Sequence, residues 1–340
     1  MQIPLLDVSA LYQAASSRRD LTDRALMSAA HDAGLIQITG LGGVVDTGKT
    51  RREALKRIFA LDSTDLRRLW RQKFAPDHSN VYRGWFPLQP GHPTLKEGID
   101  IGPDVLGGND EVPDASDPLR EATPMPSESQ LPGWRAAAAA HYRGMTRLGG
   151  MLMRSIARGL GLEERFFDEM FLGGISTMRL IHYPPRPPGS ADLVGAPHVD
   201  SGLVTLLMQD GVGGLQGRTR AGDFVDVPVQ DDTLVVNFGR LLELWSGGRI
   251  RATEHQVLGS ARERYSFPFF YEPRVDARIA PLNTTQRSFE PFLYGDFVWQ
   301  CSMQFVEFKG LDALRPHRGS AEAIRQALSP SNGRGEAKQR

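Results

Sequence analysis

The sequence predicts a mainly β core with flanking helices, an α+β fold, and two kinds of pattern carry this prediction. Between residues 175 and 280, short apolar runs such as 203–208 and 232–237 are separated by glycine-rich segments. Short apolar runs that end at turn residues are typical of β-strands. Outside this region, longer stretches carry apolar residues at spacings of three and four, the period of an amphipathic helix. A chain of 340 residues can bury most of its unfolded surface in one core.

The first 174 residues are predicted to be a helical and loop region that packs on the β core. Residues 21–33 have the pattern of one amphipathic helix, and residues 51–69 that of one or two more. Residues 74–133 are rich in proline and glycine, so we expect loops that cross the mouth of the β core. Residues 134–160 predict a long helix with one apolar face.

The second half of the chain predicts the core and its closure. The β core is expected over residues 175–280 and closing helices over residues 281–328. Residues 329–340 are polar and basic, so we expect a disordered tail.

Composition argues against several classes of protein. Forty basic and forty acidic residues cancel, so nothing favours nucleic acid or an anionic membrane as a partner. No run of eighteen apolar residues occurs that could span a bilayer. The single cysteine, Cys301, excludes an internal disulfide and suits a reducing compartment. We therefore expect a cytoplasmic protein, a monomer or weak homo-oligomer, that acts on a small molecule.

The most informative motif is His198-Val199-Asp200, followed 57 positions later by His255. Alternate residues of a strand share a face, so His198 and Asp200 can reach one ion from a strand or its end. Two imidazoles and one carboxylate can hold a divalent metal on one side and leave the other side open. This ligand set suits iron(II), manganese or zinc, and the same set also serves hydrolytic zinc sites.

A second pair, Arg264 and Ser266, follows the same alternation and favours iron over zinc. Together they offer a bidentate fork and a hydroxyl to a carboxylate. A hydrolase has no evident need for such an anchor, whereas an oxygenase that consumes a dicarboxylic keto acid does. An isolated His-x-Asp is more often an N-cap or a solvated loop. The ordered combination of the two motifs in strand-like sequence argues against coincidence.

Residues from about 80 to 310 resemble the isopenicillin N synthase-like family of iron(II) and 2-oxoglutarate-dependent oxygenases. The matching stretches are 178–185, 197–210, 213–216, 235–239, 244–246, 252–257 and 264–266. Two earlier stretches, 83–88 and 96–102, resemble the region that leads to the family's pocket. The resemblance implies a double-stranded β-helix, or jelly roll, wrapped by N- and C-terminal helices.

The resemblance also implies roles for single residues. His198, Asp200 and His255 would be the iron ligands. Arg264 and Ser266 would bind the distal carboxylate of 2-oxoglutarate, with help from Tyr183. The implied reaction uses O2, with ascorbate as a candidate reductant. It couples decarboxylation of 2-oxoglutarate to succinate and CO2 with hydroxylation, desaturation or cyclisation of a small molecule.

The substrate pocket is less constrained by the sequence. If Tyr183 points inward, Arg179 on the same strand should point inward too, unless a bulge intervenes. A buried Arg needs an anion, so Arg179 either contacts the cosubstrate or an acidic substrate, or pairs with a structural carboxylate. The other candidates for the pocket, each with core packing as its alternative role, are Arg83, Trp85, Phe86, Leu203, Leu244 and Phe270.

Two positions depart from the common family pattern. Arg240 stands where Asp is usual, and Gln256 where Arg is frequent. Neither is a metal ligand in this alignment, so both are expected to alter outer pairing. They weaken any transfer of substrate identity from the family, and neither the substrate nor the position of oxidation follows from the sequence.

Other functions stay open. Residues 43–50 match the phosphate-binding pattern G-x-x-x-x-G-K-T after a strand-like 35–39, which is typical of a nucleotide binder. A nucleotide-binding domain needs further parallel strands, however, and residues 60–130 are charged and proline-rich instead. A family member that keeps iron without using 2-oxoglutarate, or a binding protein that has lost turnover, would carry the same triad.

Overall fold

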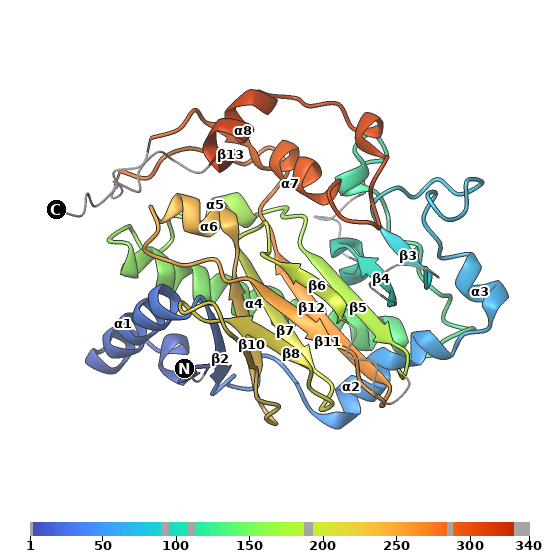
Figure 1. Cartoon of the computed structure of the whole chain (residues 1–340), viewed down its shortest axis with the longest axis horizontal. Helices are drawn as coiled ribbons and strands as arrows, with labels where there is room; N and C mark the ends of the chain where they lie inside the picture. Colours follow the sequence, from blue (N-terminus) through green and yellow to red (C-terminus); the bar gives the residue numbers. More distant parts are fainter. Residues whose placement is uncertain (1–2, 90–94, 108–112, 187–192, 284–287, 330–340) are drawn as a thin grey trace.

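Two β-sheets form the centre of the protein in a computed structural model that describes residues 3–89, 95–107, 113–186, 193–283 and 288–329 (Figure 1). The larger sheet has eight strands, in the spatial order β1 (Leu5–Asp7), β2 (Leu35–Thr39), β10 (Leu234–Phe238), β7 (Val204–Gln209), β12 (Arg264–Tyr271), β5 (Thr177–Tyr183), β4 (Glu97–Ile101) and β3 (Gly84–Phe86). The smaller sheet has four, β6 (Leu193–His198), β11 (His255–Leu258), β8 (Leu215–Arg218) and β9 (Phe224–Asp226). Neighbouring strands in both sheets are antiparallel except β1 and β2.

Helices cover the sheets and the ends of the chain. They are α1 (Ser17–Asp32), α2 (Lys49–Lys56), α3 (Ser63–Arg67), α4 (Trp134–Gly159), α5 (Asp168–Phe171), α6 (Arg240–Trp245), α7 (Tyr294–Ser302) and α8 (Ala321–Leu328). Short 3-10 helices lie at Ser9–Tyr12, Arg57–Ala60, Pro103–Leu106, Pro118–Arg120 and Asp312–Leu314, and a two-stranded pair joins β13 (Arg278–Ile279) to β14 (Phe292–Leu293). The predicted mainly β core with flanking helices is confirmed.

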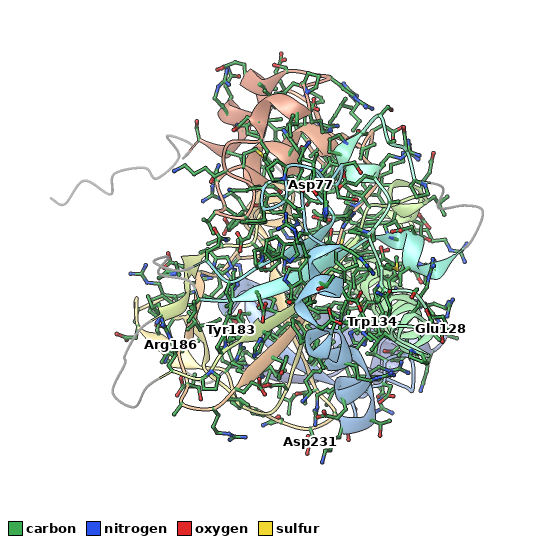
Figure 2. The ribbon with its side chains drawn as sticks, turned by 90° about the vertical axis from the view of Figure 1, so that its right-hand side faces the viewer. Asp77, Glu128, Trp134, Tyr183, Arg186 and Asp231 are labelled. Atoms are coloured by element: carbon green, nitrogen blue, oxygen red, sulfur yellow. The ribbon has the colours of Figure 1, made fainter. Side chains whose placement is uncertain are left out.

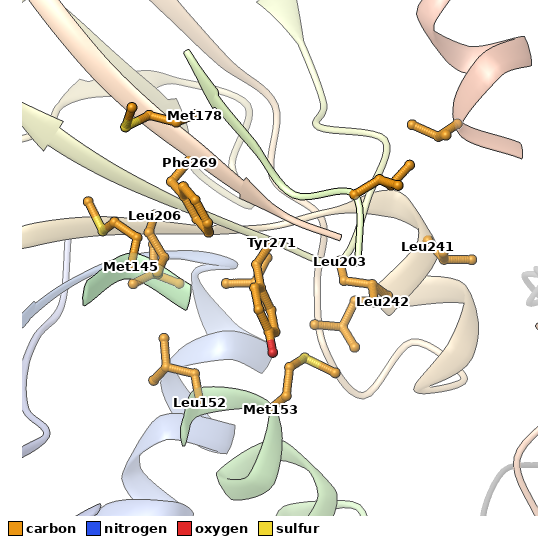
Figure 3. Close-up of a cluster of buried hydrophobic side chains, with 14 of the residues drawn as sticks. Met145, Leu152, Met153, Met178, Leu203, Leu206, Leu241, Leu242, Phe269 and Tyr271 are labelled. Carbon is orange, nitrogen blue, oxygen red and sulfur yellow. The ribbon is translucent and has the colours of Figure 1, made fainter. Parts of the chain in front are cut away.

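One apolar layer lies between the larger sheet and α4. Figure 3 shows Met145 and Leu152 of α4 beside Phe269 and Tyr271 of β12. All four are buried, and Phe269 and Tyr271 alternate along β12 with residues that face the other way. At Gly149 of α4 a Cβ atom would lie 2.6 Å from the Tyr271 ring, so only glycine lets the helix approach this closely. The opposite face of β12 is thereby left to line the functional site.

A second apolar cluster lies between the two sheets. Ile181 and Tyr183 of β5 and Leu207 of β7 come from the larger sheet, and Val194 of β6 and Val257 of β11 from the smaller one. The strands that the structure describes form no hydrogen-bonded closure between the two sheets. Side-chain packing therefore holds the two layers together across the interior.

The N- and C-terminal parts both contribute to the core. The first 174 residues supply β1, β2, β3 and β4 of the larger sheet as well as helices and loops. In the C-terminal part, which crosses the top of Figure 1, the buried Arg315 side chain donates hydrogen bonds to Asp117 at 2.8 Å and to Asp296 at 2.8 Å. The domain boundaries at 174, 280 and 328 stay a prediction, and residues 330–340 of the predicted tail lie outside the described residues.

Among the helices of the described residues, none has the length and apolar character needed to cross a membrane.

Candidate active site

The predicted metal ligands converge at the edge of the smaller sheet. His198 ends β6, Asp200 follows two residues later, and His255 begins β11 directly opposite His198 in the antiparallel register. Asp200 Oδ1 lies 3.9 Å from His198 Nε2 and 3.7 Å from His255 Nε2. One ligand atom from each residue fits within a 4.8 Å cluster. A single divalent ion can therefore be held among the three side chains.

The hydrogen bonds of the two imidazoles favour metal binding. His198 Nδ1 lies 2.8 Å from the carbonyl oxygen of Ala196, and His255 Nδ1 lies 3.2 Å from that of Thr253. An Nδ1–H that donates to a carbonyl leaves the Nε2 lone pair free for a metal. Burial, and to a smaller extent the nearby His255, lower the pKa of His198 to about 4. The His198 ring is therefore neutral near pH 7, as a metal ligand must be.

Asn237 of β10 is a site residue that the sequence reasoning missed. Its Nδ2 donates to Asp200 Oδ2 at 3.2 Å and lies 3.4 Å from His255 Nε2. Burial raises the pKa of Asp200, but the two histidines and hydrogen bonds from Thr205 and Asn237 outweigh it and lower that pKa. The matching stretch 235–239 contains Asn237, but nothing in that stretch links this residue to Asp200.

Asn237→Ala should weaken iron(II) binding without removing a ligand. Loss of an outer hydrogen-bond partner of a metal ligand typically lowers affinity ~10–100-fold. Anaerobic titration of the apoprotein with iron(II) measures this change. Gln256→Ala is the matched control, because Gln256 is the neighbour of His255 and donates to Gln216 at 2.8 Å instead. Equal iron affinities for wild type and Asn237→Ala would contradict the role given to Asn237.

The predicted cosubstrate residues share the interior face of β12 and β5. Tyr183 stands directly opposite Arg264 in the strand register, and its ring centroid lies 4.7 Å from Arg264 Cζ. Arg264 Nε donates to the carbonyl of Gly213 at 2.7 Å, while Arg264 Nη1 is buried without a hydrogen-bond partner. Ser266 is buried on the same face, two residues further along. A buried guanidinium with an unused donor fits a bound carboxylate. Tyr183, the last residue of β5, is labelled in Figure 2.

A cavity of about 370 Å³ adjoins the metal site. Of the residues predicted for the substrate pocket, Arg179 and Phe270 line it. The others do not line this cavity: Arg83, Trp85, Phe86, Leu203 and Leu244 are all buried elsewhere in the interior. Cavity residues that the sequence reasoning missed are Tyr82, Lys96, Thr177, Glu272, Val298, Phe305, Glu307 and Phe308. Three of them had a local signal: Thr177 lies two residues before Arg179, Glu272 lies two residues beyond Phe270, and Lys96 lies in the matching stretch 96–102.

Arg179 pairs with a structural carboxylate and also lines the cavity. Its Nε and Nη2 donate to the two Asp100 oxygens at 2.6 Å and 2.8 Å. Arg71 also donates to Asp100, so one buried carboxylate serves two guanidinium groups. Burial raises the pKa of Asp100, but Arg179 and Arg71 outweigh burial and hold that pKa at about 2. Asp100 is therefore ionised at neutral pH.

Asp100→Asn should destabilise the fold at neutral pH, and the effect should shrink in acid. The folded pKa of about 2 lies below the ordinary value of 3.8. The stabilisation is therefore complete above pH 4 and is lost as the pH falls through 2. Removing one partner from a buried ion pair costs roughly 3–5 kcal/mol. Urea unfolding of wild type and variant at pH 7 and pH 2.5 measures the gap, with the exposed Asp231→Asn as control. A gap that stays constant with pH would contradict this ionisation.

The phosphate-loop interpretation of residues 43–50 is not supported by the structure. Asp46 Oδ1 accepts a hydrogen bond from the backbone N–H of Gly48 at 2.9 Å, at the start of α2. A carboxylate of the chain itself thus takes the place that a phosphate would need. β2 also lies between β1 and the antiparallel β10, which is not the parallel arrangement of a nucleotide-binding fold.

The two departures from the family pattern lie outside the metal site. Arg240 begins α6 with an exposed side chain, and only its backbone N–H reaches Asp200, donating to the carbonyl at 2.8 Å. Gln256 donates to Gln216 of the neighbouring strand. Neither side chain lines the cavity.

Known proteins resemble the chain over most of its length. The 2OG-Fe(II) oxygenase superfamily model matches residues 174–273. A 2-oxoglutarate-Fe(II) type oxidoreductase of Emericella nidulans is 30% identical over 290 residues, which cover 80% of this chain and 80% of that protein. Isopenicillin N synthase of Streptomyces clavuligerus is 27% identical over 310 residues, covering 87% of this chain and 93% of that one.

A solved structure agrees with these relatives. A full-length Neurospora crassa protein in complex with alpha-KG and 5-formyluracil superposes with a TM-score of 0.76 at 25% identity, covering 89% of this chain and 96% of that one. The predicted jelly roll and the predicted dependence on iron and 2-oxoglutarate are confirmed by these similarities. The chain belongs to the 2OG-Fe(II) oxygenase superfamily and is an iron(II)- and 2-oxoglutarate-dependent dioxygenase.

Proposed function

We propose that this dioxygenase oxidises a C–H bond of a small molecule bound in the cavity next to His198 and Asp200. His198, Asp200 and His255 hold iron(II), and Arg264 and Ser266 bind the distal carboxylate of 2-oxoglutarate. The observation that carries this assignment is the buried, unpartnered Nη1 of Arg264, a residue that alternation places on the same face of β12 as the cavity residue Phe270.

When bound, iron(II) and 2-oxoglutarate supply an oxidant derived from O2, with succinate and CO2 as coproducts. The residues of the chain orient and shield the reactants. The hydrogen bonds from Nδ1 of each histidine fix the rings so that Nε2 faces the site. Tyr183 stacks on Arg264 and limits the directions that the guanidinium can take. The apolar side chains of both sheets exclude water around the cosubstrate.

We also propose that the substrate is a small metabolite and not nucleic acid, and that the enzyme is cytoplasmic and a monomer or weak homo-oligomer. The balanced charge and the single, buried Cys301 support this proposal. The structural relative binds 5-formyluracil together with alpha-KG, which is in keeping with a small polar substrate.

Anaerobic addition of iron(II) and 2-oxoglutarate tests the residue assignments. We expect a weak visible charge-transfer band from the chelate, followed by succinate release when O2 is admitted. The band should need both additions, and zinc in place of iron should give none. No band and no succinate would contradict the proposal. A band without succinate would instead favour a binding protein that has lost turnover. Oxidation of a substrate without succinate release would favour an oxidase that does not use 2-oxoglutarate.

A further inference from the structure

One wall of the cavity is charged and is built from three separate segments. Lys96 precedes β4, Arg179 lies on β5, and Glu307 follows α7. Lys96 Nζ lies 3.1 Å from Glu307 Oε1. The side chains of Lys96 and Arg179 are 18% and 15% exposed, while that of Glu307 is only 2% exposed. All three residues line the cavity, and the two cations are its more exposed charged groups.

The charges of this wall do not cancel. Arg71, Arg179 and Lys96 carry three positive charges, while Asp100 and Glu307 carry two negative ones, which leaves one positive charge in excess. Burial raises the pKa of Glu307, but Lys96 and Arg179 outweigh burial and lower that pKa to about 2, so Glu307 is ionised. Asp100 is already shared between two guanidinium groups, and Glu307 is paired with Lys96.

Neighbouring groups do not remove this excess. Glu272 accepts from Thr177 Oγ1 at 3.2 Å, and Thr177 Oγ1 accepts from Arg83 at 2.6 Å. The negative charge of Glu272 can therefore balance only the positive charge of Arg83. Burial raises the pKa of Glu272 to about 7, so the carboxyl is only partly ionised at neutral pH and adds little negative charge. Arg71 Nη1 is buried and lacks a hydrogen-bond partner. A buried excess cation is costly without a counterion, and a bound anion would supply it.

The remainder of the cavity is apolar and lies beside the metal site. Phe270 lines the wall next to Arg179, whose Cζ lies 5.6 Å from the Phe270 ring. Phe305 is 37% exposed, and its ring centroid lies 6.1 Å from that of His198. An exposed aromatic ring next to a metal ligand offers an apolar surface for a bound molecule to cover.

We propose that the substrate is a small organic acid whose carboxylate binds between Arg179 and Lys96, with its apolar body against Phe270 and Phe305. This inference rests on the proposed function of the same site. The carboxylate completes the charge balance of the wall, and the apolar body places C–H bonds beside His198. Arg179 thus holds Asp100 through Nε and Nη2, and its remaining nitrogen serves the substrate.

Matched pairs of acids and their primary amides test the proposal, because the two differ in charge and hardly in shape. Benzoate, phenylacetate, cinnamate and hexanoate are titrated, each beside its amide, into the anaerobic enzyme loaded with iron(II) and 2-oxoglutarate. The change in the visible charge-transfer band gives Kd, and the rise in Tm gives a second measure. At least one acid should bind about tenfold or more tightly than its amide, since charge-assisted hydrogen bonds exceed neutral ones.

Three variants test whether the preference for acids over amides depends on the charged wall. Arg179→Met and Lys96→Met should each bring the Kd ratio of acid to amide close to one. Lys96→Met is the safeguard if loss of the Arg179 pair with Asp100 prevents folding. Lys309→Met removes the same charge from an exposed position of the Glu307 segment and should leave the ratio unchanged.

Opposite results overturn the proposal. A panel in which no acid binds more tightly than its amide contradicts it, and so does a preference that survives both Arg179→Met and Lys96→Met. If wild type gives the charge-transfer band but shows no preference, only the substrate class fails. If the band itself is missing, the proposed function fails, and the Tm measurement still decides whether acids bind.

Discussion

His255→Ala should abolish iron(II) binding and with it all turnover of 2-oxoglutarate. Of the three proposed iron ligands, Asp200 and His255 are buried, and the centroid of the His255 ring lies 4.3 Å from that of the His198 ring. Two remaining ligands hold a divalent ion far less tightly than three. We expect an affinity loss well above the ~10–100-fold that an outer partner costs. Asp200→Ala should have the same effect, because it removes the anionic ligand.

Anaerobic iron(II) titration followed by colorimetric iron analysis after desalting measures the loss. The exposed His31→Ala is the matched control, since His31 lies on α1 and its Nδ1 contacts the carbonyl of Arg249. Apo wild type and His255→Ala should have similar Tm values in the presence of chelator, which separates metal binding from folding. If His255→Ala keeps stoichiometric iron after desalting, the triad is not the metal site.

The alternation of side chains along strands predicted much of this site. His198 with Asp200, and Arg264 with Ser266, each reach one face as the two-residue period requires. The same period predicted that Arg179 faces the interior, because it lies two residues before Ile181 on the same strand. What alternation could not supply is the register that sets His255 opposite His198, because strand pairing depends on contacts far apart in sequence.

The errors have a common physical origin. Leu203 lies three residues from Asp200, yet it packs in the hydrophobic core, because a turn between the two changes the direction of the side chain. Leu244 likewise belongs to the buried face of α6. The residues missed on the cavity wall, Lys96 and Glu307, are 211 positions apart, and only the folded chain brings them together. Local patterns fix which face a residue takes, while pockets are built from distant segments.

The phosphate-loop motif matches in sequence, but the fold lacks the structural conditions for binding a phosphate. Residues 43–50 match the motif and do follow a strand and precede a helix, as that interpretation requires. The function of such a loop depends on free backbone N–H groups and a parallel sheet. Here Asp46 occupies Gly48 N–H, and β10 lies antiparallel to β2. Neither condition is visible in eight residues of sequence.

Arg264→Leu should raise the Kd for 2-oxoglutarate steeply while leaving iron(II) affinity unchanged. The buried Nη1 of Arg264 lacks a partner within the protein, and its Nε is held by the carbonyl of Gly213. Each charge-assisted hydrogen bond is worth roughly 1.5–3 kcal/mol, so loss of a two-pronged contact should weaken binding by about 100-fold or more. Arg264→Lys keeps the charge but not the planar fork, so its Kd for 2-oxoglutarate should lie between those of wild type and Arg264→Leu. Ser266→Ala removes a single neutral donor and should cost less.

Titration of the charge-transfer band with 2-oxoglutarate in the iron(II)-loaded variants gives these affinities without turnover. Arg262→Leu is the matched control, because it removes an exposed arginine two residues earlier. The contrast between Arg264 and Arg179 sharpens the result. They lie on neighbouring strands, but the half-buried Arg179 has a carboxylate partner in the chain and the buried Arg264 does not. If Arg179→Met raises the Kd for 2-oxoglutarate as much as Arg264→Leu does, the assignment of Arg264 to the cosubstrate and Arg179 to the substrate is wrong.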